Sequence, residues 1–176
     1  MNQKKPNNLA RILGYAGGHK KLIILGCILS ALSAVMGLVP YLCVWLVARS
    51  ALVTWPGLDG AGDLGRWGWV AVWFAIGSIL LYFAALMSTH IVAFRAARNI
   101  RRTAMTHVLK LPLGFFTGNQ SGRLRKLIDD NAGLTEDLLA HKLPDLAATA
   151  MTPIAAIGML FLFDWRMGLL CLLTMI

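Results

Sequence analysis

Two long uncharged stretches constrain the fold of this chain more than any other feature. Residues 22–48 form 27 consecutive uncharged residues, and residues 67–94 form 28. A helix needs about 20 apolar residues to cross the hydrocarbon core of a bilayer. Only 14% of the residues are charged and 57% are hydrophobic, whereas about a quarter of the residues in a soluble protein are charged. The sequence therefore predicts an all-α membrane protein with long transmembrane helices.

The first stretch follows a basic leader, so a secretory signal is the alternative to a retained span. The apolar part of a signal is only about 7–15 residues long and precedes a small-residue cleavage site. This stretch is too long, and Pro40 within it predicts a kink. A kink would free a carbonyl near Met36 and expose Tyr41 and Trp45. These residues either line a translocation path or anchor the span at the interface, which is the commoner role of aromatic side chains.

The leader, residues 1–21, carries five Lys or Arg and no acidic residue. A weak helical spacing over residues 9–16 suggests a short amphipathic helix on the membrane surface. For the first eight residues, a disordered leader is an equal alternative. We therefore divide the chain into a cytoplasmic leader, 1–21, and a partial transmembrane domain, 22–176.

Two further apolar stretches follow. Residues 146–163 predict a third span, with Pro144 and Pro153 as kinks whose freed backbone groups neighbouring helices must satisfy. After a turn at Asp164, residues 167–176 begin a fourth apolar stretch with half the length that crossing requires. A helix that ended inside a bilayer would leave carbonyls unsatisfied. We therefore expect the chain to be the front end of a longer protein.

Two polar features interrupt the predicted spans near their inner ends. For residues 88–90, Ser-Thr-His, we favour a helix-packing hydrogen bond over a proton relay. For Asp145 we favour an ion pair with Lys142 or a role at a helix N-terminus over substrate chemistry.

Between the second and third spans, residues 95–145 predict a pair of helices outside the bilayer, which we call the arm. Arginines recur every three to four residues from Arg95 to Arg102, and the helical pattern continues to Leu111. A helix over residues 67–111 would be about 68 Å long, against a hydrocarbon core of about 30 Å. Pro112 and three glycines then predict a turn, after which a second apolar stripe over residues 124–139 returns to the membrane.

The distribution of charge predicts the orientation. The leader holds five Lys or Arg and the arm nine, whereas the two opposite loops hold two and one. The positive-inside rule therefore places the N-terminus and the arm in the cytoplasm of a multi-pass protein in the cell membrane. Because the basic residues flank apolar stretches and form no patch with interleaved aromatics, we expect no nucleic-acid partner. The three cysteines lie in apolar stretches and the four histidines are scattered, so we expect neither disulfides nor a metal site.

Two long helices joined at their tips by Phe115-Phe116, followed by Asn119-Gln120-x-Gly122-x-Leu124, resemble the first intracellular loop of ATP-binding cassette (ABC) exporters. The resemblance covers almost the whole chain, including the turn at 163–169. It implies an incomplete six-helix exporter bundle with cytoplasmic extensions, whose tip couples to a nucleotide-binding domain. The implied coupling residues are Phe115, Phe116, Thr117, Gly118, Asn119, Gln120, Ser121 and Gly122. The family usually has an aspartate where this chain has Asn131, which puts a specific ionic contact there in doubt.

The resemblance also implies partners. These are a nucleotide-binding domain on the same or a partner chain, with its ATP and Mg²⁺, and a second transporter half as a homo- or heterodimer. This chain has no Gly-x-x-x-x-Gly-Lys-Ser/Thr phosphate loop, so we expect no ATP hydrolysis and no cofactor of its own. Residues 130–136 and 141–146 look like the siderophore-associated subgroup, although no motif identifies a substrate. The alternative is a small self-contained multi-span carrier or scaffold without an ATPase.

Overall fold

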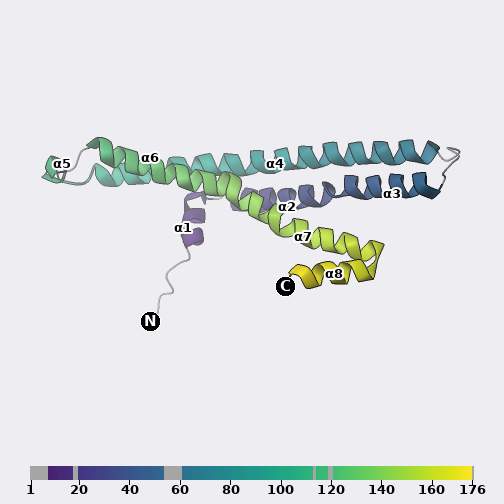
Figure 1. Cartoon of the computed structure of the whole chain (residues 1–176). Helices are drawn as coiled ribbons and strands as arrows, with labels where there is room; N and C mark the ends of the chain where they lie inside the picture. Colours follow the sequence, from purple (N-terminus) through teal and green to yellow (C-terminus); the bar gives the residue numbers. More distant parts are fainter. Residues whose placement is uncertain (1–7, 18–19, 54–60, 113, 119–120, 176) are drawn as a thin grey trace. The chain divides into compact units, whose positions relative to one another are not determined.

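A computed structural model describes residues 8–17, 20–53, 61–112, 114–118 and 121–175, which are helical apart from short turns (Figure 1). The elements in chain order are α1 (Asn8–Tyr15), α2 (Lys20–Met36), α3 (Val39–Val53), α4 (Ala61–Val108), α5 (Gly114–Gly118), α6 (Ser121–Asp137), the π-helix η2 (Leu138–Lys142), α7 (Leu143–Phe163) and α8 (Trp165–Met175). The predicted all-α class is confirmed.

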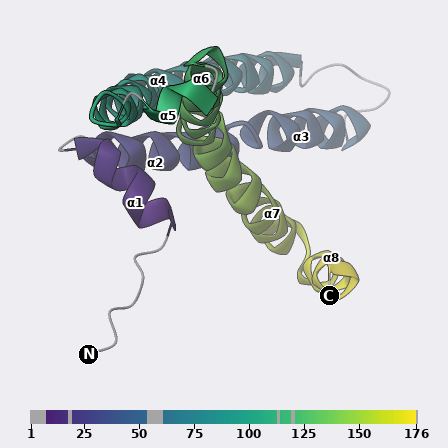
Figure 2. The same ribbon diagram turned by 90° about the vertical axis from the view of Figure 1, so that its left-hand side faces the viewer.

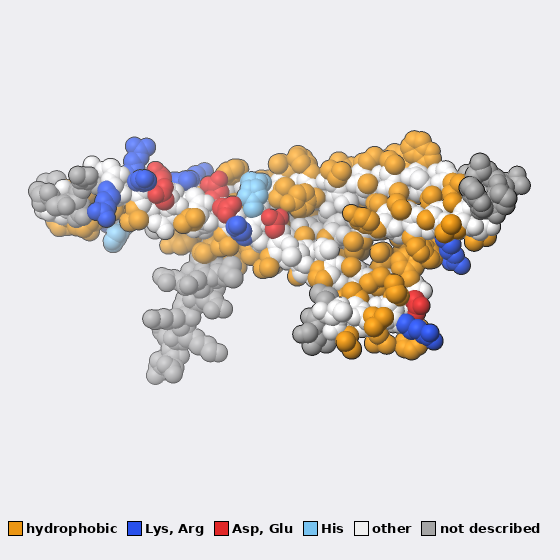
Figure 3. All heavy atoms as spheres, viewed as in Figure 1, with side chains coloured by type: hydrophobic (Ala, Val, Ile, Leu, Met, Phe, Trp, Pro, Cys, Tyr) orange, Lys and Arg blue, Asp and Glu red, His pale blue; other side chains and the backbone are white. Residues whose placement is uncertain are grey.

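Three helical segments are long and apolar enough to cross a membrane by length and composition. They are Lys20–Val53, Leu64–Val108 and Ser121–Phe163, with mean hydropathies of 2.6, 2.2 and 2.0, and Trp165–Thr174 is a shorter apolar helix. Hydrophobic side chains cover α3, α7 and the N-terminal part of α4, whereas charged side chains gather over α6 and the C-terminal part of α4 (Figure 3). The chain is therefore a multi-pass membrane protein whose polar residues are concentrated in the arm.

The first span differs from the single kinked helix that the sequence predicts. Helix α2 ends at Met36 and α3 begins at Val39. In the turn between them, the N–H of Gly37 donates to the carbonyl of Ser33 at 2.8 Å and that of Leu38 to the carbonyl of Val35 at 3.1 Å. Pro40 thus occupies the first turn of α3, where a missing N–H costs no helical hydrogen bond. The span is broken before the proline instead of being bent by it.

The described chain clusters into two compact units. We call residues 1–26 and 86–144 the arm unit, and residues 27–85 and 145–176 the span unit. Helix α4 contributes to both, because its 48 residues are continuous from Ala61 to Val108.

The core of the arm unit combines two larger side chains, Val92 and Leu139, with a set of small ones. On α4, Ala93, Ala96 and Ala97 are fully buried, and Ala132 of α6 and Ala140 of η2 are buried as well. Residues three to four apart lie on one helical face, so α4 presents a stripe of methyl groups to its partner. Small residues let helix backbones approach closely, and Figures 1 and 2 both show α6 alongside the C-terminal part of α4.

A proline in the returning helix is compensated from α4. Pro144 has no N–H to offer the carbonyl one turn earlier, that of Ala140. The hydroxyl of Thr89, which is fully buried, lies 3.0 Å from this carbonyl and donates to it. The π-helical turn precedes the proline, with the N–H of Leu143 donating to the carbonyl of Leu138. The expected packing hydrogen bond at residues 88–90 is therefore present, and a neighbouring helix supplies a donor to the carbonyl that Pro144 leaves free, as predicted.

We expect Thr89→Val to lower the thermal stability of the detergent-purified protein, because it keeps the side-chain shape but leaves the Ala140 carbonyl without this donor. The expected loss is about 1–2 kcal/mol of unfolding free energy. Thr106→Val is the matched control, since the Thr106 hydroxyl bonds only the Arg102 carbonyl of its own helix. Equal melting curves for the two variants would show that the α4–η2 hydrogen bond contributes nothing.

The leader is held against α4. Helix α1 covers Asn8–Tyr15, as the apolar spacing predicts, and the side-chain amide of Asn99 donates to the carbonyl of Tyr15 at 2.9 Å. The membrane-surface location of this helix stays a prediction, and residues 1–7 lie outside the described residues.

The span unit packs α2 against α4 through reciprocal serine hydrogen bonds. The hydroxyl of Ser33 donates to the carbonyl of Ser78 at 2.8 Å, and that of Ser78 donates to the carbonyl of Ser33 at 3.1 Å. Two glycines make the approach possible. A side chain at Gly77 would meet the Met36 methyl group at 3.0 Å, and one at Gly37 would meet the Ser78 hydroxyl at 3.2 Å.

Candidate functional site

The tip of the arm is the short helix α5, which lies where α4 and α6 meet (Figure 1). Helix α4 ends in a turn in which the N–H of Leu111 donates to the carbonyl of Val108. Pro112 cannot continue the helix. Its carbonyl instead accepts the N–H of Phe115 at 2.9 Å and so initiates α5. The five residues Gly114–Gly118 form a compact aromatic tip.

The two aromatic residues of the tip have different environments. Their rings meet edge to face, with centroids 5.5 Å apart and planes at 89°. Phe115 is 37% exposed, whereas Phe116 is half-buried. Phe116 lines a pocket of about 340 Å³ together with Met105, Val108, Ser121, Gly122, Leu124, Arg125 and Ile128. Phe115 is thus the aromatic side chain available to a partner, and Phe116 packs between the helices of its own arm.

The other predicted coupling residues follow this aromatic pair in the sequence. Thr117 and Gly118 complete α5, while Ser121 and Gly122 begin α6 and line the pocket. Asn119 and Gln120 lie outside the described residues.

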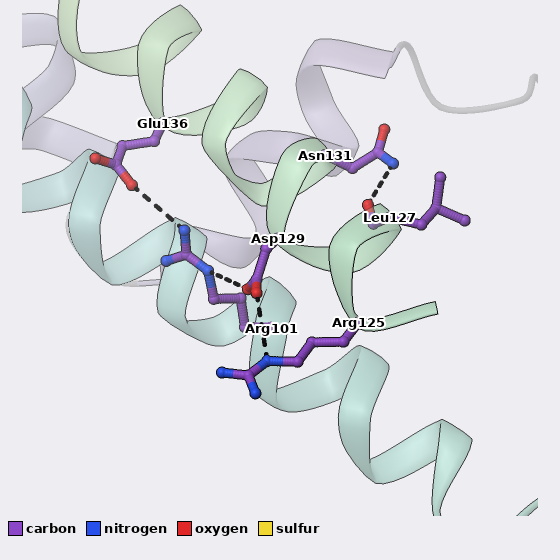
Figure 4. A network of polar contacts seen from close by, with 6 residues as sticks. All are labelled: Arg101, Arg125, Leu127, Asp129, Asn131 and Glu136. Atoms are coloured by element: carbon purple, nitrogen blue, oxygen red, sulfur yellow. Dashed lines mark hydrogen bonds and ion pairs between the residues drawn. The ribbon is translucent and has the colours of Figure 1, made fainter. Parts of the chain in front are cut away.

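An ion-pair network joins the two helices of the arm (Figure 4). Arg101 of α4 lies between two carboxylates of α6, with Nε 3.3 Å from Asp129 and a terminal guanidinium nitrogen 3.9 Å from Glu136. Arg125 shares Asp129 at 3.8 Å. These side chains are between 28% and 76% exposed, so each pair contributes only about 0.2–1 kcal/mol. Their main consequence is to fix the register of α6 against α4.

Asn131, which stands where the resembling family has an aspartate, takes no part in this network. Its amide donates to the carbonyl of Leu127 in its own helix at 2.7 Å (Figure 4). The ionic contact between the helices comes instead from Asp129, two residues earlier.

The three residues expected to line a pathway have three different environments. The Met36 side chain packs on Gly77. Tyr41 is 69% exposed. Trp45 is held from two sides, because its ring centroid lies 4.5 Å from that of Phe163, and the Arg49 guanidinium lies over the indole at 5.3 Å. Tyr41 is the most accessible of the three, and no described contact joins them into one site.

One polar contact in the span unit was not expected from the sequence. The hydroxyl of Tyr82 donates to Oδ1 of Asp145 at 3.0 Å. Among the residues that the structure describes, no ion pair joins Asp145 to Lys142. Asp145 also cannot cap a free helix end, since η2 runs directly into α7. The neighbour of Asp145 is therefore a tyrosine 63 residues away, and the only sequence signal for it was a polar ring within an uncharged stretch.

Two histidines of the arm unit, His90 of α4 and His141 of η2, lie against each other. The rings of His90 and His141 are 4.8 Å apart, edge to face, and the buried Nδ1 of His90 has no hydrogen-bond partner among the described atoms. Within the described residues, no group of three or more His, Cys, Asp or Glu side chains could hold a metal ion.

Long apolar helices, two of which extend into a charged helical arm with an aromatic tip, define the chain as a polytopic membrane domain with a polar extension. Residues 23–176 match the family model described as the ABC transporter transmembrane region. The chain belongs to this family.

Among its relatives are mycobactin import ATP-binding/permease proteins IrtA. The Mycobacterium tuberculosis protein is 33% identical over 149 residues, 84% of this chain and 17% of that protein. The Mycolicibacterium smegmatis protein is 31% identical over 152 residues, 85% of this chain and 17% of that protein. An ATP-dependent lipid A-core flippase of Albidiferax ferrireducens is 26% identical over 170 residues, 93% of this chain and 27% of that protein. The chain thus spans under a third of each of these relatives.

Proposed function

We propose that this chain is the membrane-spanning part of an ATP-driven ABC transporter, in which it contributes to the translocation pathway and couples that pathway to a nucleotide-binding domain outside the chain. The observation that carries the proposal is the aromatic tip α5 at the end of the arm, in a chain that belongs to the ABC transmembrane family.

The tip has features of a docking element. An exposed aromatic side chain is well suited to anchor an interface, since large rings bury much area at a low cost in side-chain entropy. We assign Phe115–Gly122 to the contact with the nucleotide-binding domain, with Phe115 as the anchor and Phe116 as its support.

The arm transmits movement as a lever. Helix α4 is continuous over 48 residues, or about 72 Å. The alanine stripe and the Arg101 network hold α6 to it, so the two helices would move as one body when nucleotide-binding domains close. Met36, Tyr41 and Trp45 are the proposed pathway residues, of which exposed Tyr41 is the first to test.

The proposed location is the cell membrane, with the leader and the tip in the cytoplasm, because fourteen of the seventeen Lys and Arg residues flank that side. The proposed domain division is the leader, 1–21, and a partial transmembrane domain, 22–176. A second transporter half would complete the pathway as a homo- or heterodimer.

The proposed substrate is a siderophore. Residues 130–136 and 141–146 resemble the siderophore-associated subgroup, and two relatives are mycobactin import proteins. The flippase relative is named for lipid A-core, so the substrates named for the relatives differ.

The proposal is tested by movement of ferric mycobactin across the membrane of proteoliposomes that contain the full-length transporter. With ATP and Mg²⁺ outside the vesicles, on the side of the nucleotide-binding domains, we expect release of preloaded mycobactin for an importer or accumulation for an exporter, and neither with a non-hydrolysable analogue. ATP-dependent movement of lipid A-core without mycobactin movement would replace the substrate but retain the transporter. Movement of mycobactin that is independent of ATP would support the self-contained carrier and contradict the proposal.

A further inference from the structure

Asp145 is a carboxylate at the depth of the apolar spans. Its hydrogen-bond partner Tyr82 lies within the uncharged stretch 67–94 of α4, about 24 Å from Arg66 and about 20 Å from Arg95 along the helix. Asp145 itself precedes Phe163 by about 27 Å along α7. Since the hydrocarbon core is about 30 Å thick, the first estimate places Tyr82 well inside it, whereas the second places the Asp145 backbone within about 3 Å of one edge. The hydrogen bond to Tyr82 directs the carboxylate from that edge toward the interior of the core.

No ion pair to this carboxylate is found among the described residues, although Lys142 lies only three residues earlier, in η2. The other charged residues in the described part of the span unit lie near helix ends, at Arg49, Asp63, Arg66, Asp164 and Arg166. The Arg49 guanidinium lies over Trp45 and that of Arg166 over Trp165. A carboxylate in hydrocarbon without a counter-ion is costly, so acidic residues in spans face a protein interior or a water-filled path and mark substrate or ion sites.

The pair is also accessible. Asp145 is exposed in this chain and Tyr82 is 38% exposed, so the hydrogen bond leaves part of the carboxylate open. Thr149 lies one turn further along α7 and is exposed as well. Residues four apart share a helical face, so a hydroxyl and a carboxylate line the same side of α7.

We propose that Asp145 is a substrate-contacting residue that binds a positively charged group of an amphipathic molecule in the translocation path, with Tyr82 as the residue that positions its carboxylate. The proposal rests on the proposed function for the existence of the path. It deepens that function by naming the charge that the substrate carries, independently of whether the substrate chelates iron.

The test uses two probes of matched shape and opposite charge, tetraphenylphosphonium and tetraphenylborate. Their binding to the full-length detergent-purified transporter is measured by equilibrium dialysis, with protein-free micelles as background. We expect the wild type to bind the cation about tenfold or more tightly than the anion, because a carboxylate attracts one and repels the other. Asp145→Asn should reduce this preference to about twofold or less, and Asp145→Glu should retain it.

Asp164→Asn is the matched control. It removes the same charge from the same unit, but at the turn where the Asp164 carboxylate accepts the N–H of Arg166 at 2.9 Å. This variant should keep the full preference for the cation. Gel filtration and thermal unfolding of every variant separate lost binding from lost folding, and Asp145→Glu supplies a folded, charged comparison if Asp145→Asn is unstable.

Tyr82→Phe tests the positioning role. It should lower the cation preference about threefold in the wild type, the effect of one net hydrogen bond, and should have no effect in an Asp145→Asn background. An effect of equal size in both backgrounds would overturn that role.

The proposal is overturned if the wild type shows no preference for the cation, or if Asp145→Asn keeps it. Asp145-dependent cation binding without any ATP-driven transport would contradict the proposed transport function but leave the binding site intact. The Asp145 binding site and the proposed transport function can therefore be contradicted independently of each other.

Discussion

Phe115→Ala should uncouple ATP hydrolysis from transport. Phe115 is the exposed ring of α5, and truncating a central aromatic anchor of an interface typically costs 2 kcal/mol or more, so transport in proteoliposomes should fall by about tenfold or more. ATP hydrolysis should persist but lose its stimulation by substrate, because the proposed contact that joins it to the spans is weakened. Membrane insertion should be unchanged, since Phe115 is not among the residues that line the pocket between α4 and α6.

Two variants make this result specific. Phe94→Ala removes an exposed ring from α4, 56% accessible, far along the chain from the tip, and should leave coupling intact. Phe116→Ala removes a ring that lines the pocket between α4 and α6. It enlarges this pocket and should therefore lower thermal stability as well as transport. Unchanged substrate-stimulated transport in the Phe115→Ala, Phe116→Ala double variant would show that α5 is not the docking element.

Ser33→Leu should prevent correct packing of α2 on α4. Ser33 is 5% exposed, and its hydroxyl takes part in the reciprocal hydrogen bonds with Ser78. A leucine side chain has two more heavy atoms than serine, at a crossing where Gly37 and Gly77 already leave no free space. Overpacking costs about 1–3 kcal/mol, and the lost hydrogen bonds add about 1 kcal/mol. We expect a large fall in the yield of monodisperse protein from detergent.

Ala51→Leu is the control, because it adds a leucine to an exposed position of α3. The yield of this variant should match that of the wild type. Wild-type yield and melting temperature for Ser33→Leu would contradict the close α2–α4 crossing.

The spans could be predicted from the sequence because the cost of burying charge in hydrocarbon is large and local. A stretch such as residues 67–94 can hardly be anything but a transmembrane helix. The same holds for the tip, where Pro112 and Gly114 end one helix in any context. A side-chain hydrogen bond from residues 88–90 to a neighbouring helix could also be predicted, because these polar residues lie within an apolar span. Which carbonyl would accept it, that of Ala140, could not.

Features that depend on how one helix is rotated against another could not be predicted. The different exposure of Phe115 and Phe116 follows from the orientation of α5. This helix has only five residues, too few for an apolar periodicity that would show which ring is buried. The break at Gly37 and Leu38 depends on turn hydrogen bonds, whereas the sequence around Pro40 permits either a break or a kink. The Tyr82–Asp145 contact joins residues 63 positions apart and required the register of α7 against α4.

Photo-crosslinking from the tip of the full-length transporter tests the assignment of α5 as the contact with the nucleotide-binding domain. With p-benzoylphenylalanine in place of Phe115, we expect a crosslink to a nucleotide-binding domain, with a yield that changes when ATP is trapped. The same probe in place of Trp69, at the other end of α4 and 67% exposed, should give no such product. A crosslink from position 69 but none from position 115 would contradict the assignment of α5 as the contact with the nucleotide-binding domain.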